Sequence, residues 1–297
     1  MINKKASALA ATNRRAVFAG LLSLIVLLSP GKPAVAGAQI TISPTRIVFE
    51  GRTRSASVNL INRGNETSTF RIKFEHKRMT RDGQFELVKQ PKEGELFSDQ
   101  MIRYSPRQVV LPPGKSQVVR LLLRKPPNLA DGEYRSHMLF SEVPKQASKT
   151  IEAQTGKSKQ LSISIKPILG ISIPVIVRSG STDATVSFSS MQLAKISKDQ
   201  TRAELSLVMM RSGNRSVYGD LVVKQKKRKD DKDGVVVSQI NGIAVYSPNQ
   251  VRTATLALQA PKGDRFNTGY LEVTYRSKPD DGDKILAQGQ IALPAQK

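Results

Sequence analysis

The chain has 297 residues, of which 47 are Lys or Arg and 24 are Asp or Glu, so its formal charge is +23 at pH 7. It contains no cysteine, which excludes disulfide scaffolds, cysteine-ligated zinc, iron–sulfur clusters and thiol catalysis. With only His76 and His137, histidine-rich metal sites and most histidine-based catalytic triads are disfavoured. The composition therefore indicates a folded binding or scaffolding protein with no catalytic residue, metal or cofactor, long enough for two domains.

The first 36 residues have the order of segments that signal peptidase requires. Basic residues precede an apolar run over 16–28 that is too short to span a bilayer, and the small residues 34–36 follow. We expect a Sec-type signal peptide over 1–36, cleaved after Ala36 or Ala38, with an uncleaved membrane anchor as the alternative. Cleavage after Ala36 leaves 42 basic and 24 acidic residues, a formal charge of +18. No later apolar stretch has membrane-spanning length, so we expect a periplasmic protein without an integral membrane segment.

The rest of the chain alternates between apolar and polar residues in short segments bounded by turn residues. Strands of this length and spacing, with no stretch of helical period, predict an all-β protein built from antiparallel β-sandwiches. The predicted strands of the first half are 39–49, 55–61, 70–76, 108–111, 117–123, 136–142 and a long one at 161–175. Those of the second half are 184–188, 203–210, 218–224, 234–238, 252–258, 269–275 and 286–293.

The apolar pattern is interrupted at 178–182, where the sequence reads Arg-Ser-Gly-Ser-Thr. We place the domain boundary there, which predicts one domain over 37–178 and a second over 179–297. Residues 57–65 resemble residues 206–214, and each is a predicted strand that runs into a Gly-Asn turn. This similarity fits two related sandwiches, but the same pattern is common turn chemistry, and both interpretations remain open at this point.

The segment 161–175 is unlike the other predicted strands. At about 3.3 Å per residue it is about 50 Å long, more than one sandwich of ordinary strand length covers. Pro167 cannot donate to a strand ladder, and the polar stretch 145–159 before it has the composition of a loop. The segment either completes the core of the first domain or is an edge strand that pairs with another protein. One parity is an apolar row, and the other, which includes Ile168, is mostly polar. The apolar row consists of Leu161, Ile163, Ile165, Leu169, Ile171, Ile173 and Val175.

Five segments, in this order, resemble the PapD-like periplasmic pilus chaperones. They are Ile-Ser-Pro-Thr-Arg-Ile-Val-Phe at 42–49, the strand and turn at 58–65, Leu-Pro-Pro-Gly-Lys-Ser-Gln and the strand after it at 111–121, the stretch 133–144, and Ile-Pro-Val-Ile-Val at 173–177. The resemblance covers residues 40–178. Over the second half of the chain, the resemblance extends to little more than the presence of a second β-sandwich. It implies two immunoglobulin-like β-sandwich domains arranged in an L or boomerang, and no enzymatic activity.

The resemblance also implies a function in pilus assembly, fimbrium biogenesis and cell wall organization. Chaperones of this family stabilise pilin subunits that lack a strand by lending them an edge strand, called donor-strand complementation, and deliver them to an outer-membrane usher. The residues of this chain that would contact the subunit are Leu161, Ile163, Ile165, Leu169, Ile171 and Ile173.

In the family, a basic pair binds the terminal carboxylate of the subunit. Arg46 stands at the position of the family's arginine, and a guanidinium can hold a carboxylate through two parallel hydrogen bonds. Many members have a lysine near the end of the donor strand, where this chain has Pro174, a departure typical of the divergent or archaic branch. Arg135 and Lys166 are the basic residues that remain as a second anchor.

Each anchor also has a plainer interpretation. Arg46 could be an ordinary solvated strand residue, and Arg135 could form a structural pair with a nearby acid such as Glu133 or Glu142. A charged run at 224–234 could be read as a nucleic-acid patch, but it contains both signs of charge and lacks accompanying aromatic residues. Its sequence is Lys-Gln-Lys-Lys-Arg-Lys-Asp-Asp-Lys-Asp-Gly. We interpret it as a solvated hairpin loop, and we expect no nucleic-acid partner. The acids at 280–283 lack the spacing of a calcium loop and predict a turn.

A second function from another class remains possible on the sequence. The chain would then be a basic secreted adhesive or structural protein in which both sandwiches are closed. Its formal charge of +18 after cleavage would attract anionic envelope polymers. The two functions differ in whether the strand at 161–175 has an open edge.

Overall fold

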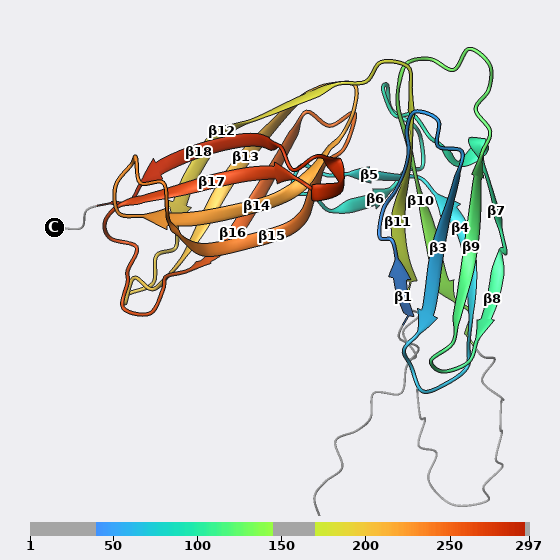
Figure 1. The fold of residues 1–297 in the computed structure, drawn as a ribbon, viewed down its shortest axis with the longest axis horizontal. Helices are drawn as coiled ribbons and strands as arrows, with labels where there is room; N and C mark the ends of the chain where they lie inside the picture. The colour runs from blue at the N-terminus through green and yellow to red at the C-terminus, as the bar shows by residue number, and fades with distance from the viewer. Residues whose placement is uncertain (1–39, 145–169, 295–297) are drawn as a thin grey trace, which may run out of the picture. The chain divides into compact units, whose positions relative to one another are not determined.

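The computed structural model in Figure 1 describes residues 40–144 and 170–294, which belong to one compact unit, Ala38–Lys297. Within these residues the only helical segments are two short 3₁₀ turns, η1 (Asp99–Met101) and η2 (Pro279–Asp281). All other regular structure consists of strands, so the prediction of an all-β fold is confirmed.

The first sandwich consists of two sheets that enclose one apolar core. The four-stranded sheet has the order β1 (Ile40–Ser43), β3 (Ser55–Asn62), β9 (Ser116–Leu123) and β7 (Ile102–Ser105). The five-stranded sheet has the order β2 (Ile47–Phe49), β11 (Gly170–Ser179), β10 (Gly132–Glu142), β4 (Ser68–Glu75) and β8 (Gln108–Leu111). Alternate residues of each strand point inward, and the core includes the fully buried Phe49, Leu60, Phe70, Met138 and Phe140.

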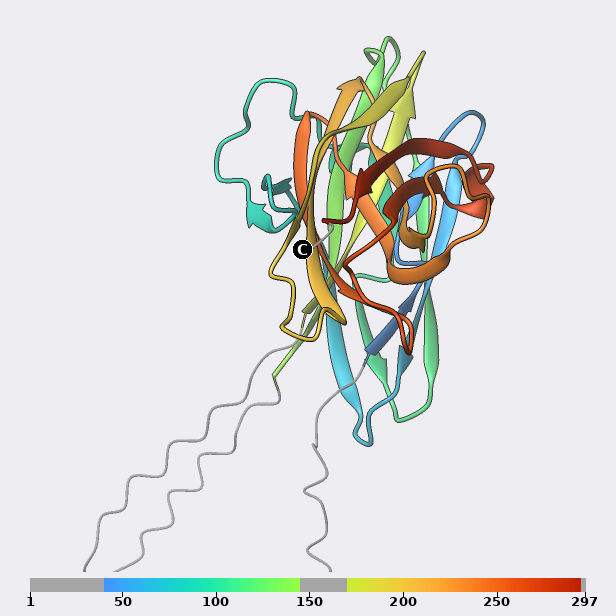
Figure 2. The same cartoon turned by 90° about the vertical axis from the view of Figure 1, so that its left-hand side faces the viewer.

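The second sandwich has its own core. Figure 2 looks along its strands. One sheet has the order β12 (Ala184–Ala194), β13 (Arg202–Gly213) and β16 (Val251–Gln259). The other has the order β15 (Val235–Val245), β14 (Val217–Lys226), β17 (Tyr270–Ser277) and β18 (Ile285–Ala292). Leu205, Leu207, Leu221, Val273 and Tyr275 are buried between them. The prediction of two β-sandwiches is therefore confirmed.

Most predicted strands are present, some with longer ends than the pattern indicated, but the single strand predicted at 39–49 is wrong. The chain divides there into β1, which pairs antiparallel with β3, and β2, which pairs parallel with β11 in the opposite sheet. Pro44 lies between them and has no backbone N–H to continue a ladder, which suits the point where the chain passes from one sheet to the other.

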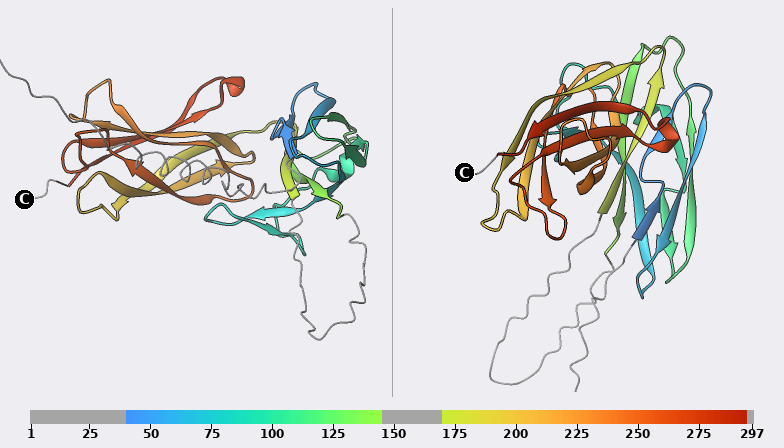
Figure 3. Two further views of the ribbon diagram at one scale, coloured as in Figure 1. Left: turned by 90° about the horizontal axis from the view of Figure 1, so that it is seen from below. Right: turned by 60° about the vertical axis from the view of Figure 1, so that its left-hand side comes forward.

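Two short strands that the sequence analysis did not predict form a separate hairpin. β5 (Lys77–Met79) pairs antiparallel with β6 (Phe85–Leu87), and the turn at 81–83 forms the tip of the hairpin. The hairpin extends from the first sandwich as a narrow cyan ribbon in Figure 3. Strands of three residues are too short to show an alternating pattern, which is why the sequence did not predict them.

Two neighbouring leucines of β9 allow a direct test of the core. Leu121 is 1% exposed and packs in the first core, whereas Leu122 points outward and is 42% exposed. We expect Leu121→Ala to lower the free energy of unfolding by about 2–5 kcal/mol, because it leaves a cavity among packed side chains. Leu122→Ala is the matched control, with an expected change of about 0.5 kcal/mol. Urea unfolding measures both values, and equal losses would contradict the assignment of the inward face.

Candidate functional site

The backbone of β11 is hydrogen-bonded along the whole of one flank but along only part of the other. β10 pairs with β11 from end to end, whereas β2 pairs with its opposite flank only at Val175–Val177. The opposite flank at Gly170–Pro174 therefore has no strand partner among the described residues. The Ser172 hydroxyl lies in this stretch and is buried without a hydrogen-bond partner in the described structure. Open strand flanks of this kind are the places where another chain can add a strand.

The side chains of β11 pass from exposed to buried along the strand. Ile171 is 38% exposed, whereas Ile173 is 2% exposed and packs in the first core with Val175 and Val177. Of the residues predicted to contact a subunit, the structure thus places Ile171 at the surface and Ile173 in the core. Leu161, Ile163, Ile165 and Leu169 lie outside the described residues, as does Lys166.

Arg46 lies between β1 and β2 with its guanidinium largely buried. Its side chain is 11% exposed, its Nη1 is 3.7 Å from Asp281 Oδ2, and its guanidinium carbon is 4.6 Å from the ring centre of Tyr218. The Nε and Nη2 atoms are buried and have no hydrogen-bond partner in the described structure. Arg46 is therefore not an ordinary solvated residue. Because buried donors without acceptors are costly, this guanidinium retains a capacity to bind an anion.

A hollow of about 340 Å³ lies beside Arg46. Its charged lining is predominantly basic: Arg46, Arg178, Arg215 and Lys284 against Asp183 and Asp281. Part of this charge is already neutralised, because Arg178 pairs with Glu133 and Glu50, and Arg215 Nη1 lies 3.6 Å from Glu50 Oε1. Arg46 differs from these two arginines because its Nε and Nη2 have no acceptor in the described structure, so an added carboxylate would satisfy them.

Arg135 on β10 is buried and has no carboxylate partner among residues 40–144 and 170–294. Its Nη1 donates to the carbonyl oxygen of Lys77 at 3.2 Å, and its Nη2 donates to that of Ser247 at 3.5 Å. The guanidinium carbon lies 4.4 Å from the ring centre of Tyr246, and Nε has no partner in the described structure. Burial lowers the pKa of Arg135. The alternative in which Arg135 pairs with Glu133 is not formed, since Glu133 pairs elsewhere.

The two arginines are gathered around a pair of tyrosines. Arg46 stacks on Tyr218 and Arg135 on Tyr246. Both tyrosines contact one small apolar cluster, in which Tyr246 is buried and Tyr218 is half-buried. Burial raises the pKa of the Tyr246 hydroxyl, and the nearby charges of Arg46 and Arg135 oppose that rise. Two of the three predicted anchors thus share one environment.

Glu133 forms a buried, fully hydrogen-bonded network that sequence reasoning missed. Its Oε2 accepts from Arg178 Nε at 3.1 Å and from the Ser216 backbone N–H at 3.2 Å, and the Ser216 hydroxyl donates to Oε1. Arg178 Nη1 also donates to Glu50 Oε2 at 2.7 Å. Burial alone would lower the pKa of Arg178, but Glu133 and Glu50 outweigh it, so that pKa is raised. The sequence pattern places Arg178 at the domain boundary, and no local pattern indicates partners this distant in sequence.

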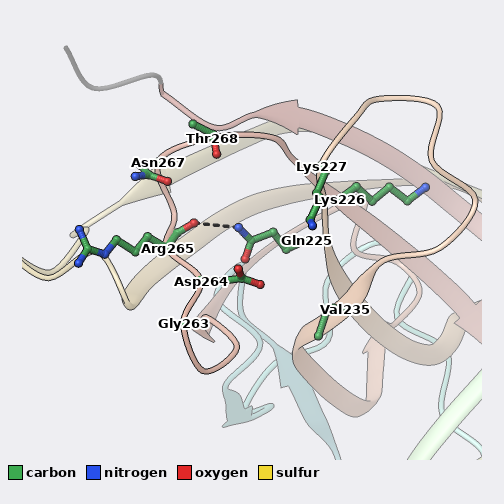
Figure 4. Close-up of a pocket in the computed structure, with 9 residues that line it drawn as sticks. All are labelled: Gln225, Lys226, Lys227, Val235, Gly263, Asp264, Arg265, Asn267 and Thr268. Carbon is green, nitrogen blue, oxygen red and sulfur yellow. Dashed lines mark hydrogen bonds between the residues drawn. The ribbon is translucent and has the colours of Figure 1, made fainter.

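The second sandwich contains a separate hollow of about 430 Å³, drawn in Figure 4. Gln225 Nε2 donates across it to the Arg265 carbonyl oxygen at 2.8 Å, and Lys226 and Lys227 come from the charged run at 224–234. The interpretation of that run as a solvated loop is wrong for its first residues. They belong to β14, and Lys226 is buried with its Nζ 2.7 Å from Glu272 Oε2. No residue of β11 and none of the predicted anchors lines this hollow.

Comparison with known proteins identifies the first sandwich. Residues 39–178 match the family model of the pili and flagellar-assembly chaperones, PapD N-terminal domain. The resemblance predicted from the sequence is thereby confirmed over this range. Pilus chaperones are periplasmic proteins without enzymatic activity. A search of curated proteins found no match.

Solved structures of chaperones resemble the chain at low sequence identity. One comes from the CsuC–CsuE chaperone–tip adhesion subunit pre-assembly complex of archaic chaperone-usher Csu pili of Acinetobacter baumannii, with 14% identity, 88% of this chain and 100% of that chain covered, and a TM-score of 0.43. Another is the Escherichia coli chaperone DraB, with 12% identity, 86% and 97% covered, and a TM-score of 0.40. A third comes from the Salmonella enterica SafA pilin in complex with the SafB chaperone, with 11% identity, 86% and 96% covered, and a TM-score of 0.39.

The described residues show neither a membrane-spanning helix nor a metal-binding cluster. Among the described residues, no helix is long and apolar enough to cross a membrane. In the same part of the chain, no group of three or more His, Asp or Glu side chains is arranged to hold a metal ion.

His137 provides a test of the environment around Arg135. Burial, followed by the charges of Arg135 and Lys77, lowers the pKa of His137 to about 3. Since the pKa in the unfolded chain is about 6.5, the unfolded chain takes up this proton first as pH falls. His137 should therefore reduce the free energy of unfolding as pH falls from about 6.5 towards 3, with no effect above that range.

The imidazole signals of His137 in NMR spectra of the folded protein should not shift between pH 8 and pH 5. In the variant His137→Phe, the free energy of unfolding should depend less on pH below about 6.5. Titration of His137 near 6.5 in the folded protein would contradict the buried environment.

Proposed function

Proceeding from the match between residues 39–178 and the PapD N-terminal domain, we propose that the chain is a periplasmic chaperone for pilus or fimbrial subunits. It binds a subunit by donor-strand complementation through β11 and delivers it to an outer-membrane usher. The observation that carries this proposal is the open flank of β11 at Gly170–Pro174 beside the exposed Ile171.

The open flank supplies what strand addition requires. Backbone N–H and C=O groups on that side can form a ladder with a subunit strand, and apolar side chains of one parity can fill its groove. In the proposal, the apolar row that contacts the subunit includes Ile171 together with Leu161, Ile163, Ile165 and Leu169. Each fully buried side chain contributes about 1.5–3 kcal/mol before ordering costs are subtracted. Ile173 supports the strand from within its own core rather than contacting the subunit.

Arg46 is the proposed anchor for the terminal carboxylate of the subunit. Its two buried donors, Nε and Nη2, have no acceptor in the described structure, and a carboxylate satisfies such a pair with two parallel hydrogen bonds. Arg135 is the proposed second anchor in place of the lysine that Pro174 replaces, because it shares the tyrosine pair with Arg46. Lys166 remains the alternative second anchor.

The remaining parts of the proposal concern processing and domains. Residues 1–36 are a Sec-type signal peptide, residues 37–178 form the chaperone domain, and residues 179–297 form the second domain. The chain acts without cofactor. The alternative, a basic adhesive that binds anionic envelope polymers, leaves the open flank of β11 without a role.

Replacing Ile171 by Asp tests strand lending without removing a core residue. We expect Ile171→Asp to abolish recovery of a pilin from the same genome that is co-expressed with the chaperone, because a carboxylate cannot enter an apolar groove unpaired. Recovery of the pilin should also fall in Ile163→Asp, Ile165→Asp and Leu169→Asp. Leu122→Asp, which alters an exposed leucine of β9, is the matched control and should leave recovery unchanged. Undiminished pilin recovery by all four strand variants, or binding that only salt removes, would favour the adhesive function.

Replacing Arg46 tests the anchor separately from the strand. Arg46→Ala should weaken binding of the C-terminal peptide of the co-purified pilin by about 10- to 150-fold, the equivalent of about 1.5–3 kcal/mol for a charge-assisted hydrogen bond. The amidated form of the same peptide should bind wild type and Arg46→Ala equally. Arg120→Ala, which removes an exposed arginine of β9, is the control. Equal losses for the acid and the amide would show that Arg46 does not bind the carboxylate.

A further inference from the structure

The tip of the β5–β6 hairpin is hydrogen-bonded to the second sandwich. The Thr253 backbone N–H donates to the Arg81 carbonyl oxygen at 2.7 Å, and Asn249 Nδ2 donates to the Met79 carbonyl oxygen at 2.6 Å. Thr253 belongs to β16, an edge strand that pairs with β13 on its other side. The hairpin therefore occupies part of an edge that would otherwise present free backbone groups.

Apolar side chains of the hairpin reinforce this contact. Met79 is 4% exposed and packs in a cluster with Ile176 of β11, and with Ala244 and Tyr246 at and just beyond the end of β15. The Phe85 ring lies 6.0 Å from the Tyr246 ring, centre to centre. The cluster thus contains side chains from the first sandwich, the hairpin and the second sandwich.

Gly83 permits a close approach between the hairpin tip and the second sandwich. It has φ of +86°, which favours glycine, and a Cβ added there would lie 2.4–2.7 Å from atoms of the Arg252 guanidinium. Arg252 is held in place because its Nη1 donates to the Ala244 carbonyl oxygen. The guanidinium therefore covers the turn, and any side chain at position 83 would displace it.

The base of the hairpin contacts Arg135 and its neighbour. The Lys77 carbonyl oxygen accepts from Arg135 Nη1, and the Phe85 ring packs edge-on against His137 at 5.0 Å. Since Tyr246 forms the stacking surface of Arg135 and also contacts Phe85, the hairpin determines two of the contacts that orient this guanidinium.

We propose that the β5–β6 hairpin is a latch, which fastens the first sandwich to the edge of β16 and positions Arg135. The Arg252 guanidinium packs over Gly83 and holds the hairpin tip against β16; we call this contact the closure. The positioning of Arg135 rests on the proposed function, whereas the closure does not. The residues of the latch are positioning residues, because none of them needs to touch the bound subunit.

The closure is tested by amide hydrogen exchange in the full chain. The Thr253 amide should be protected in wild type, because the Arg81 carbonyl is its acceptor, and Gly83→Val should speed its exchange by about tenfold or more. Gly263→Val is the matched control. Gly263 has nearly the same φ, +90°, but a Cβ there meets nothing within 4 Å. Exchange of Thr253 should be unchanged in this control.

A double variant separates steric displacement from a general loss of stability. If Gly83→Val acts by pushing Arg252 aside, it should have little further effect in the Arg252→Ala background. Rapid exchange of the Thr253 amide in wild type, or equal acceleration by Gly83→Val and Gly263→Val, would overturn the latch.

The positioning of Arg135 is tested by the ratio of affinities for the free-acid and amidated forms of the pilin C-terminal peptide. Gly83→Val should lower this ratio several-fold, and Arg135→Ala should do the same. A general loss of stability would instead weaken binding of the free-acid and the amidated peptide equally. An unchanged ratio together with faster Thr253 exchange would overturn the positioning. If wild type binds neither peptide, the proposed function fails, while the exchange measurements still decide the closure.

Discussion

A β-strand has two hydrogen-bonding flanks, and the structure depends on how β11 uses them. One flank is paired with β10 along the whole strand, so the strand is held firmly in its own sheet. The other is paired with β2 only at Val175–Val177. Unpaired strand edges invite aggregation, and proteins usually shorten, charge or cover them. Among the described residues the flank beside the exposed Ile171 has no strand partner, and the proposed subunit would complete it.

The burial gradient along β11 would allow the strand to belong to its own sheet and also pair with the proposed subunit. Ile173, Val175 and Val177 pack in the first core, and the next residue, Arg178, is tied to Glu133 in a buried pair. The cost of ordering the strand is therefore largely met within the chain itself. A partner that pairs with the open end meets a backbone already in extended form, which lowers the cost of association.

The sequence predicted the strands better than it predicted their contacts. In segments such as 55–61 and 203–210, apolar and polar residues alternate because one face of the strand is buried. This alternation can be read from neighbouring residues alone, so the sequence predicts these strands. The three-residue strands β5 and β6 are too short for such a pattern. The partners of Glu133, Arg178 and Lys226 are set by tertiary packing far along the chain, which local spacing cannot indicate. For the same reason, the sequence singled out Arg46 only through family resemblance, and its unpaired buried donors became visible only in the structure.

The electrostatics around the tyrosine pair follow from a shortage of acids. Glu133 is fully engaged by Arg178 and Ser216. Among the described residues, Arg135 therefore contacts carbonyl oxygens and the Tyr246 ring, and Arg46 contacts the Tyr218 ring and Asp281. Aromatic rings and carbonyls hold a guanidinium in place without neutralising it. Positive charge therefore remains in a partly dehydrated environment, where an added carboxylate is attracted more strongly than it would be at the surface. Burial, followed by the charges of Arg135 and Lys77, also lowers the pKa of His137 and favours its neutral form.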